Sequence, residues 1–136
     1  MKASCQCGKL TAEVADGAEA MTILCHCLDC QRRTGSPFGT IAYFPREAVT
    51  VSGTPSEYTR TGDSGQTLTR GFCPECGAAV YVKASRLPEI TGVPVGAFAD
   101  PTFAQPIRSV YEQSKHHWVQ AHEAATHHPQ GRDTSW

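Results

Sequence analysis

The sequence predicts a small, mainly β domain, and three observations support this prediction. Short segments of alternating or β-branched residues recur along the chain, separated by turns that contain glycine and proline. The chain has 136 residues, which fits one domain of ordinary size with its own core. All seven cysteines fall in close clusters, which favours stabilisation by bound metal ions.

The strand predictions follow the apolar pattern in chain order. Leu10, Ala12 and Val14 alternate with polar residues, which is typical of a half-buried strand. Further strands are expected at residues 23–24, 40–44, 49–51, 57–61, 66–72, 79–82, 93–97 and 107–111. Because these segments are short and regularly spaced, we expect a mainly β domain.

Helical pattern is sparse, and the chain shows no internal repeat or interdomain linker. Residues 28–34 are expected to form one helical turn, which Gly35 ends. Residues 118–126 are expected to form a second short helix, with Trp118 as its packing anchor. We expect a single domain over residues 1–128 and a flexible tail over residues 129–136.

Composition and charge exclude several classes of partner. Twelve Lys and Arg residues against thirteen Asp and Glu give a formal net charge of −1. Nucleic-acid binders draw most of their affinity from basic excess, so we expect no nucleic-acid partner. No apolar stretch approaches the roughly 20 residues that cross a bilayer, and the first residues resemble no export signal. We therefore expect a cytoplasmic protein without membrane contact.

The cysteines indicate metal ligation rather than disulfides. They lie in the strings Cys5-Gln6-Cys7, Cys25-His26-Cys27-Leu28-Asp29-Cys30 and Cys73-Pro74-Glu75-Cys76. Their odd number and the absence of an export signal disfavour a disulfide framework. Closely spaced thiolates are the usual ligands of zinc. A redox-active C-x-x-C pair would leave the other clusters unexplained.

Seven cysteines divide most simply into four and three. Structural zinc takes four protein ligands, whereas catalytic zinc keeps three and an open position. We therefore expect a structural site on Cys5, Cys7, Cys73 and Cys76, and a second site on Cys25, Cys27 and Cys30. A closed second site, completed by His26 or by a C-terminal histidine, is the alternative. In an extended C-x-C segment His26 would face away from the thiols, which places it behind them or at the surface.

Five of the six histidines lie between His116 and His128. A further metal site there is one interpretation. The simpler one is a polar segment with incidental affinity for divalent metals, because adjacent histidines do not share a helix face.

The cysteine strings resemble those of the glutathione-dependent formaldehyde-activating enzyme family, which also contains centromere protein V. Beyond the cysteines, the similar segments are Thr34-Gly35-Ser36-Pro37-Phe38, Gly96-Ala97-Phe98-Ala99-Asp100-Pro101, Pro106-Ile107-Arg108 and Ser114-Lys115-His116-His117-Trp118. The resemblance runs from residue 3 to about residue 120. The ordered cysteine pattern is its most specific part.

The resemblance implies a zinc-stabilised fold of several coiled antiparallel sheets, called a β-tent, with structural zinc on Cys5, Cys7, Cys73 and Cys76. It also implies a second, more loosely held zinc on the other three cysteines. The family's named activity is condensation of formaldehyde with glutathione, a carbon–sulfur lyase reaction in reverse. This chain has Phe98-Ala99-Asp100 where the family often has a Leu-Asp-Asp-type run, so one acidic position is missing. If that position shapes access to the site, the substrate differs from that of the family.

The chemistry of three thiolates suggests how the second site acts. With Zn²⁺ they carry a net charge of −1, which suits a soft ligand better than water. A thiol bound in the open position would be deprotonated, and its sulfur would attack a small electrophile. We expect Cys25, Cys27 and Cys30 to be the catalytic residues, with a zinc that is only partly occupied.

Substrate contacts are expected just after the three-cysteine string. Arg32 and Arg33 are candidates for the carboxylates of a glutathione-like thiol, and Ser36 and Phe38 for the pocket wall. Arg70 and Lys115 are further cationic candidates. His26 or Asp29 could transfer a proton.

Two other functions compete with a lyase. One is a zinc-stabilised interaction module without catalysis, and the other is a redox-sensitive zinc site that releases its ion on oxidation. Exposed edges of small sheets also suggest a homodimer.

Overall fold

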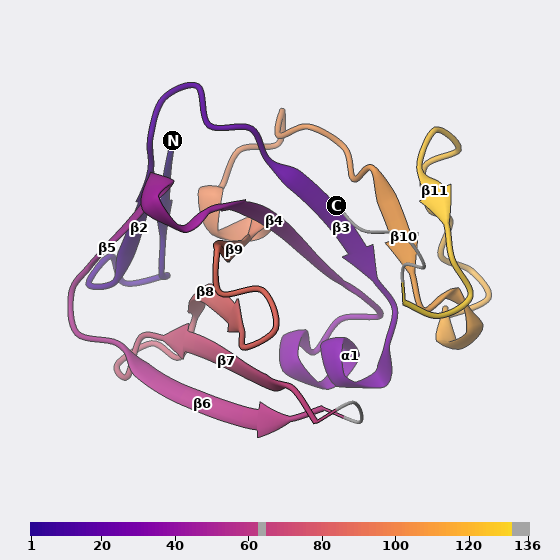
Figure 1. Cartoon of the computed structure of the whole chain (residues 1–136), viewed down its shortest axis with the longest axis horizontal. Helices are drawn as coiled ribbons and strands as arrows, with labels where there is room; N and C mark the ends of the chain where they lie inside the picture. Colours follow the sequence, from indigo (N-terminus) through magenta and orange to yellow (C-terminus); the bar gives the residue numbers. More distant parts are fainter. Residues whose placement is uncertain (63–64, 132–136) are drawn as a thin grey trace. The chain divides into compact units, whose positions relative to one another are not determined.

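The structure, a computed structural model, describes residues 1–62 and 65–131, in which strands predominate (Figure 1). This confirms the predicted mainly β class. The chain forms two compact units, one of residues 1–20 and 42–101 and one of residues 21–41 with those from 102 onward. The single domain over residues 1–128 stays a prediction. Within the described ranges, no helix has the length and apolar character needed to span a membrane.

The first unit contains a three-stranded antiparallel sheet in the order β1-β2-β5. Its strands are β1 (Lys2–Ser4), β2 (Thr11–Val14) and β5 (Val49–Ser52). A 3₁₀ turn, η1 (Arg46–Ala48), leads into β5. Before η1 runs β4 (Gly39–Pro45), which begins in the second unit and ends in the first.

Four further strands of the first unit run in the order β9-β8-β7-β6. They are β6 (Ser56–Thr61), β7 (Thr67–Phe72), β8 (Ala79–Ala84) and β9 (Ile90–Pro94), and each neighbouring pair is antiparallel. A 3₁₀ turn, η2 (Val95–Phe98), follows β9. The connections from β6 to β7 and from β7 to β8 are short, and short connections between sequential strands favour antiparallel hairpins.

The apolar alternation that predicted the strands also builds the core of the first unit. On β2, Ala12 and Val14 are fully buried while Glu13 between them is exposed. The strand β2 contacts β8, and β1 contacts η2. The buried apolar side chains of this unit include Ala3, Leu10, Ala12, Val14, Phe44, Val80, Val82 and Val93.

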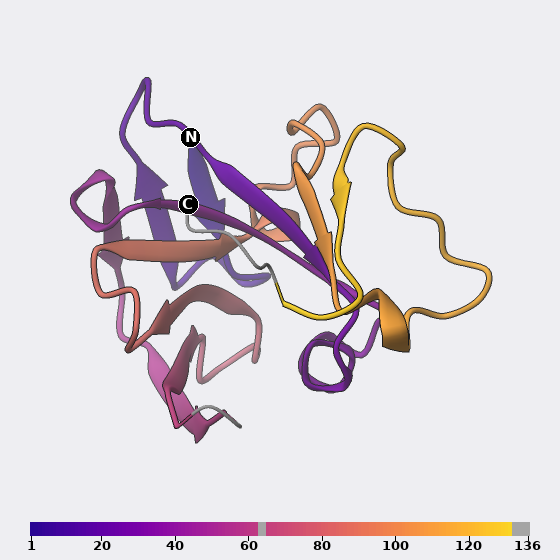
Figure 2. The ribbon, with the colours of Figure 1, turned by 45° about the vertical axis from the view of Figure 1, so that its right-hand side comes forward.

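The second unit combines one helix with three parallel strands, seen side by side in Figures 1 and 2. They are β3 (Met21–Cys25), β10 (Arg108–Val110) and β11 (Thr126–His127), in the order β11-β10-β3. The expected antiparallel pairing does not extend to these strands, because β10 pairs in parallel with both neighbours. The connections between these strands are long, and long connections permit parallel pairing.

The helix of the second unit, α1 (Leu28–Thr34), matches the predicted segment. Its first turn is closed by Cys27, whose Sγ accepts from the Cys30 N–H. It ends at Gly35, which has φ of 69°, a left-handed conformation that glycine adopts without strain. A 3₁₀ turn, η3 (Glu112–Ser114), follows β10.

Some elements differ from those predicted. The strand expected at residues 93–97 begins earlier, at Ile90, and gives way to η2. No helix forms over residues 118–126, where turns lead into β11, and Trp118 is 63% exposed rather than a packing anchor. The strands β1 and β11 were not predicted. In the predicted tail, the Pro129 and Gln130 carbonyls accept backbone hydrogen bonds, while residues 132–136 lie outside the described residues.

Candidate metal centres and the adjoining pocket

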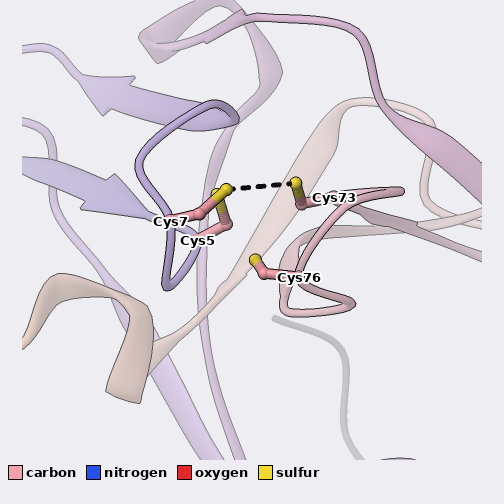
Figure 3. Close-up of side chains that lie close together, drawn as sticks. All are labelled: Cys5, Cys7, Cys73 and Cys76. Atoms are coloured by element: carbon pink, nitrogen blue, oxygen red, sulfur yellow. Dashed lines mark hydrogen bonds between the residues drawn. The ribbon is translucent and has the colours of Figure 1, made fainter.

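Two matching turns of the first unit bring four cysteines together (Figure 3). Cys5 and Cys7 lie in the loop between β1 and β2, and Cys73 and Cys76 in the turn between β7 and β8. In both turns the first cysteine's N–H donates to a carbonyl five residues on, at 2.9 Å and 3.0 Å. The glycine after each second cysteine has a left-handed φ, 86° at Gly8 and 80° at Gly77.

The spacing of these sulfurs fits a tetrahedral metal ion. All four Sγ atoms lie within 4.8 Å of one another. Cys7 Sγ lies 3.7 Å from Cys5 Sγ and 3.6 Å from Cys73 Sγ. A tetrahedron with Zn–S bonds of about 2.3 Å has edges of about 3.8 Å. These distances exceed a disulfide bond, and all four cysteines are free.

The electrostatics of the four thiols call for a cation. Backbone N–H groups, from Ala78 first and then Cys7, lower the pKa of Cys76 to about 6. The pKa of Cys7 is raised to about 11: a hydrogen bond from the Lys9 backbone lowers it, but desolvation and the neighbouring thiols outweigh that bond. The group therefore cannot hold four thiolates by itself, whereas a bound Zn²⁺ would stabilise all of them.

The second unit brings Cys25, Cys27 and Cys30 together. Cys25 ends β3, Cys27 caps α1 and Cys30 lies in the first turn of α1. Their Sγ atoms lie within 4.8 Å of one another, and all three side chains are half-buried. Among residues 1–62 and 65–131, this group contains no fourth ligand atom from His, Asp, Glu or Cys.

His26 is turned away from this group, as the C-x-C alternation requires. It continues the buried face of β3, formed by Thr22 and Leu24. Its ring is fully buried, shares a hydrogen bond of 3.0 Å between Nε2 and Ser109 Oγ, and packs edge-on against Phe38. Burial lowers the pKa of His26, which keeps the ring neutral. Of the two sequence-based placements, behind the thiols or at the surface, the surface one is wrong.

One of the three thiols is strongly acidic. The pKa of Cys27 is lowered, mainly by hydrogen bonds from the Cys25 and Cys30 thiols. The same thiolate raises the pKa of Cys25. Without a cation the group would hold one thiolate beside two thiols, so full deprotonation requires a metal ion.

The second unit also contains a pocket of about 480 Å³, which none of the three cysteines lines. It is lined by Leu28, Gln31, Arg32, Gly35, Ser36, Pro37 and His116. Leu28 and Gln31 directly follow Cys27 and Cys30 in the chain. Of the predicted contact residues, Arg32 and Ser36 line this pocket, whereas Arg33 and Phe38 do not.

The remaining candidates lie elsewhere. Phe38 packs on His26, and the Arg70 guanidinium lies 5.2 Å from the centre of the Tyr58 ring. Lys115 follows η3, and Asp29 lies in the first turn of α1. Neither lines the pocket.

Sequence reasoning missed Gln31 as a functional residue and treated His116 only as one of a histidine-rich segment. Gln31 Nε2 donates to the carbonyls of His26 and Ser114, at 3.0 Å and 3.1 Å. Its Oε1 lies 3.0 Å from His116 Nε2. Because its amide nitrogen is already committed to two carbonyls, Oε1 must accept, and His116 Nε2 must be the donor. A neutral His116 therefore keeps the lone pair on Nδ1.

The C-terminal histidines form no metal site in the described part of the chain. None of the ligand groups found there includes a histidine. His127 Nδ1 instead lies 2.6 Å from Glu112 Oε2, and His128 Nε2 lies 3.2 Å from Arg108 Nη1.

Comparison with known families agrees with this geometry. The sequence profile of the glutathione-dependent formaldehyde-activating enzyme family matches residues 1–114, which include all seven cysteines. The chain belongs to this family. The resemblance inferred from the cysteine strings is thereby confirmed.

Individual relatives of the family are distant. A Penicillium rubens protein is 26% identical over 124 residues, and a Colletotrichum graminicola protein is 28% identical over 118 residues. Both bear the name "Putative glutathione-dependent formaldehyde-activating enzyme". These matches cover 85% and 80% of this chain but only 64% and 61% of the relatives.

A solved structure shares the fold. The crystal structure of a Rhodobacter sphaeroides protein superimposes with a TM-score of 0.56 at 27% sequence identity. The match covers 71% of this chain and 86% of the other.

Proposed function

We propose that this chain is a zinc-dependent enzyme that joins a thiol such as glutathione to a small aldehyde such as formaldehyde. Written in reverse, the reaction is that of a carbon–sulfur lyase. The observation that carries the proposal is the group of Cys25, Cys27 and Cys30, which has no fourth ligand among the described residues. The residues that follow Cys27 and Cys30 in the chain, Leu28 and Gln31, line a pocket of the same unit. Family membership supports the same chemistry.

The donor sets fit two zinc ions with different roles. Cys5, Cys7, Cys73 and Cys76 supply four thiolates and would hold a structural zinc. The three-cysteine group would hold the second zinc and leave a position open. When bound there, that ion would supply a soft vacant site that lowers the pKa of an incoming thiol.

The pocket suits a peptide-like thiol that carries carboxylates. Its volume of about 480 Å³ falls within the usual range for small-molecule sites. Arg32 offers a planar cation for a carboxylate, and Ser36 offers a hydroxyl. Leu28 and Pro37 give the pocket an apolar wall. The pocket can therefore hold a small molecule with polar ends and an aliphatic middle.

The reaction requires one proton to move. The thiol sulfur forms a bond to the aldehyde carbon, the carbonyl π bond breaks, and its electron pair stays on oxygen. Overall the proton passes from sulfur to that oxygen, so a single group can take it and return it. His116 lines the pocket, and its Nδ1 lone pair is fixed by the bond from Nε2 to Gln31. We assign this proton transfer to His116 rather than to the buried His26.

The direct test is the rate of formation of S-hydroxymethylglutathione from formaldehyde and glutathione, measured by exchange NMR. We expect zinc-loaded protein to accelerate the reaction above its spontaneous rate. Cys27→Ser should remove the acceleration, and Arg32→Gln should raise the KM for glutathione more than it lowers kcat. No acceleration by folded protein with two zincs would contradict the proposal.

The acidity of Cys27 supports a second candidate, a redox-sensitive zinc site. Half-exposed cysteines with a lowered pKa are the ones that oxidants attack first. Dilute peroxide should then release one zinc and form a disulfide within the three-cysteine group. Retention of both zincs under peroxide that oxidises a control thiol protein would remove this candidate.

A further inference from the structure

Arg33 has a buried nitrogen that nothing in the fold so far explains. It lies in the last turn of α1, three residues after Cys30. Its Nη2 atom is buried and has no hydrogen-bond partner among the described residues. An unmet guanidinium donor inside a protein costs free energy, so its position calls for a compensating anion.

The space for this nitrogen exists because residue 39 is glycine. A Cβ on Gly39 would lie 2.5 Å from Arg33 Nη2 and 3.5 Å from Cys30 Cβ. Placed end to end, these distances put Arg33 Nη2 and Cys30 Cβ at most 6.0 Å apart. Gly39 is buried and does not have a positive φ, so its backbone conformation does not require glycine. A side chain at residue 39 would instead have to displace the guanidinium.

The neighbouring Arg32 contrasts with Arg33. Arg32 is exposed and lines the pocket, whereas Arg33 is half-buried and packs beside Gly39 and Cys30. The two arginine side chains therefore have different surroundings.

A zinc ion on three thiolates leaves one negative charge uncompensated. A partly buried anion needs a cation or hydrogen-bond donors nearby. Arg33 offers a fixed positive charge and a free N–H at this place, and Arg charge does not titrate near neutral pH. Its unmet donor and the excess charge of the metal site are complementary.

We propose that Arg33 is a positioning residue of the second metal site: seated in the space left by Gly39, its guanidinium neutralises the three-thiolate zinc and keeps the metal bound. The proposal rests on the second zinc of the proposed function but not on its substrate. Arg33 holds the site, while Arg32 remains available to the thiol substrate.

The test is the zinc affinity of the second site, measured by competition with a chromophoric chelator on the full chain with both sites loaded. We expect Arg33→Gln to weaken this site by about 10- to 100-fold, the usual effect of losing a partner behind a metal ligand. Arg33→Lys should fall between wild type and Arg33→Gln. Arg32→Gln is the matched control and should leave the affinity unchanged.

Gly39→Ala provides a second variant that removes no charge. It should displace the guanidinium and weaken the second site, while the four-cysteine site keeps its zinc and shows that the protein is folded. Equal affinity in wild type and Arg33→Gln would overturn the proposal, and so would equal weakening by Arg32→Gln and Arg33→Gln. If the wild-type protein binds only one zinc, both the proposed role of Arg33 and the proposed function are overturned. If it binds two zincs but does not react with thiols, only the proposed function is overturned.

Discussion

Gln31 shows how one side chain sets the chemistry of another. Its amide joins the His26 carbonyl, the Ser114 carbonyl and the His116 ring, with distances of 3.0 to 3.1 Å. Ser114 Oγ adds a hydrogen bond of 2.9 Å to the same His26 carbonyl. These bonds hold the segment after η3 against the start of α1, and they fix which nitrogen of His116 carries the proton.

His116→Gln should therefore remove the proton carrier with little effect on binding. Glutamine can still donate to Gln31, but it has no basic nitrogen. We expect kcat to fall by about 10²- to 10⁴-fold, the usual contribution of a general acid–base group, with KM nearly unchanged. Added imidazole should restore part of the rate.

His117→Gln is the control, because His117 is exposed and does not line the pocket. The pH dependence of kcat must be interpreted with the charged and titratable groups near His116. These are Arg32, which also lines the pocket, Lys115 and His117, which are its neighbours in the chain, and the buried His26. Unchanged kcat in His116→Gln would assign the proton transfer to another group.

The cysteines could be predicted from the sequence, but the Gln31–His116 pair could not. Cysteines that bind the same metal ion often lie close together in the sequence, and few other roles require several cysteines at such spacing. Gln31 and His116 are 85 positions apart, and neither glutamine nor histidine is diagnostic alone. Only the folded chain brings them into contact. The same holds for Arg33 and Arg32, which are adjacent in sequence but separated by the direction in which α1 presents them.

Among the elements, the β7–β8 hairpin is tightly packed at a single glycine. Gly71 lies opposite Tyr81, and a Cβ at residue 71 would overlap the Tyr81 ring. The ring crosses Gly71 because its hydroxyl donates to Glu57 on β6, at 2.6 Å. The sheet is irregular at this point, between Gly71 and Phe72.

Gly71→Ala should destabilise the protein by about 3 kcal/mol, near the upper end for overpacking, because the ring sits where the methyl group must go. Urea unfolding monitored by circular dichroism measures the change. Gly96→Ala is the matched control, since a Cβ there meets nothing within 4 Å. A difference below about 0.5 kcal/mol between the two variants, the scale of ordinary surface substitutions, would show that the hairpin relaxes.

Around η3, stability should depend on pH through Glu112. Burial raises the pKa of this carboxyl, but hydrogen bonds from Ser109 and His127 outweigh burial and lower it overall. The unfolded chain then binds the proton more readily, so this contribution is present above the ordinary pKa of about 4.5 and is lost as the pH falls further.

Glu112→Gln should therefore lose less stability than wild type as the pH falls below about 4.5. Glu123→Gln, an exposed carboxylate on the same unit, should behave as wild type. Both must be compared at the same zinc content, because protonated cysteines release metal. Parallel pH curves for wild type and Glu112→Gln would contradict this account.

The strand predictions succeeded where apolar and polar residues alternate along the strand. They failed where a strand forms only through contacts with residues distant in the sequence. Thr11–Val14 and Thr67–Phe72 alternate and pair locally. β11 is only two residues long and forms by pairing with β10, so no local pattern marks it. Residues 118–126 have enough helical pattern to suggest a helix, but the segment is only a chain of turns.

At the scale of the molecule, the four-cysteine site connects distant parts of the first unit's sequence. Cys7 and Cys73 are 66 positions apart, yet their sulfurs lie 3.6 Å apart. A metal ion bound by these cysteines would remove conformational entropy from the unfolded chain. Lys9 and Glu75 also bridge the two turns at 2.7 Å, but both are exposed and contribute little.

Removal of this zinc should unfold the first unit. Structural zinc contributes an apparent ~10–16 kcal/mol in finger peptides, as large as the net stability of a typical domain. Cys76→Ser should therefore unfold or aggregate, whereas Cys27→Ser should remain folded. Near-UV circular dichroism during chelation measures this, and a native spectrum after complete zinc removal would show that the site is not structural.

The most direct test of the central claim, an open thiol-binding zinc on Cys25, Cys27 and Cys30, is native mass spectrometry of zinc-replete protein with and without glutathione. We expect two zincs in wild type, one in Cys27→Ser, and a glutathione adduct only on the two-zinc form. Two zincs with no adduct at any glutathione concentration would contradict the claim and indicate a closed second site in a non-catalytic interaction module.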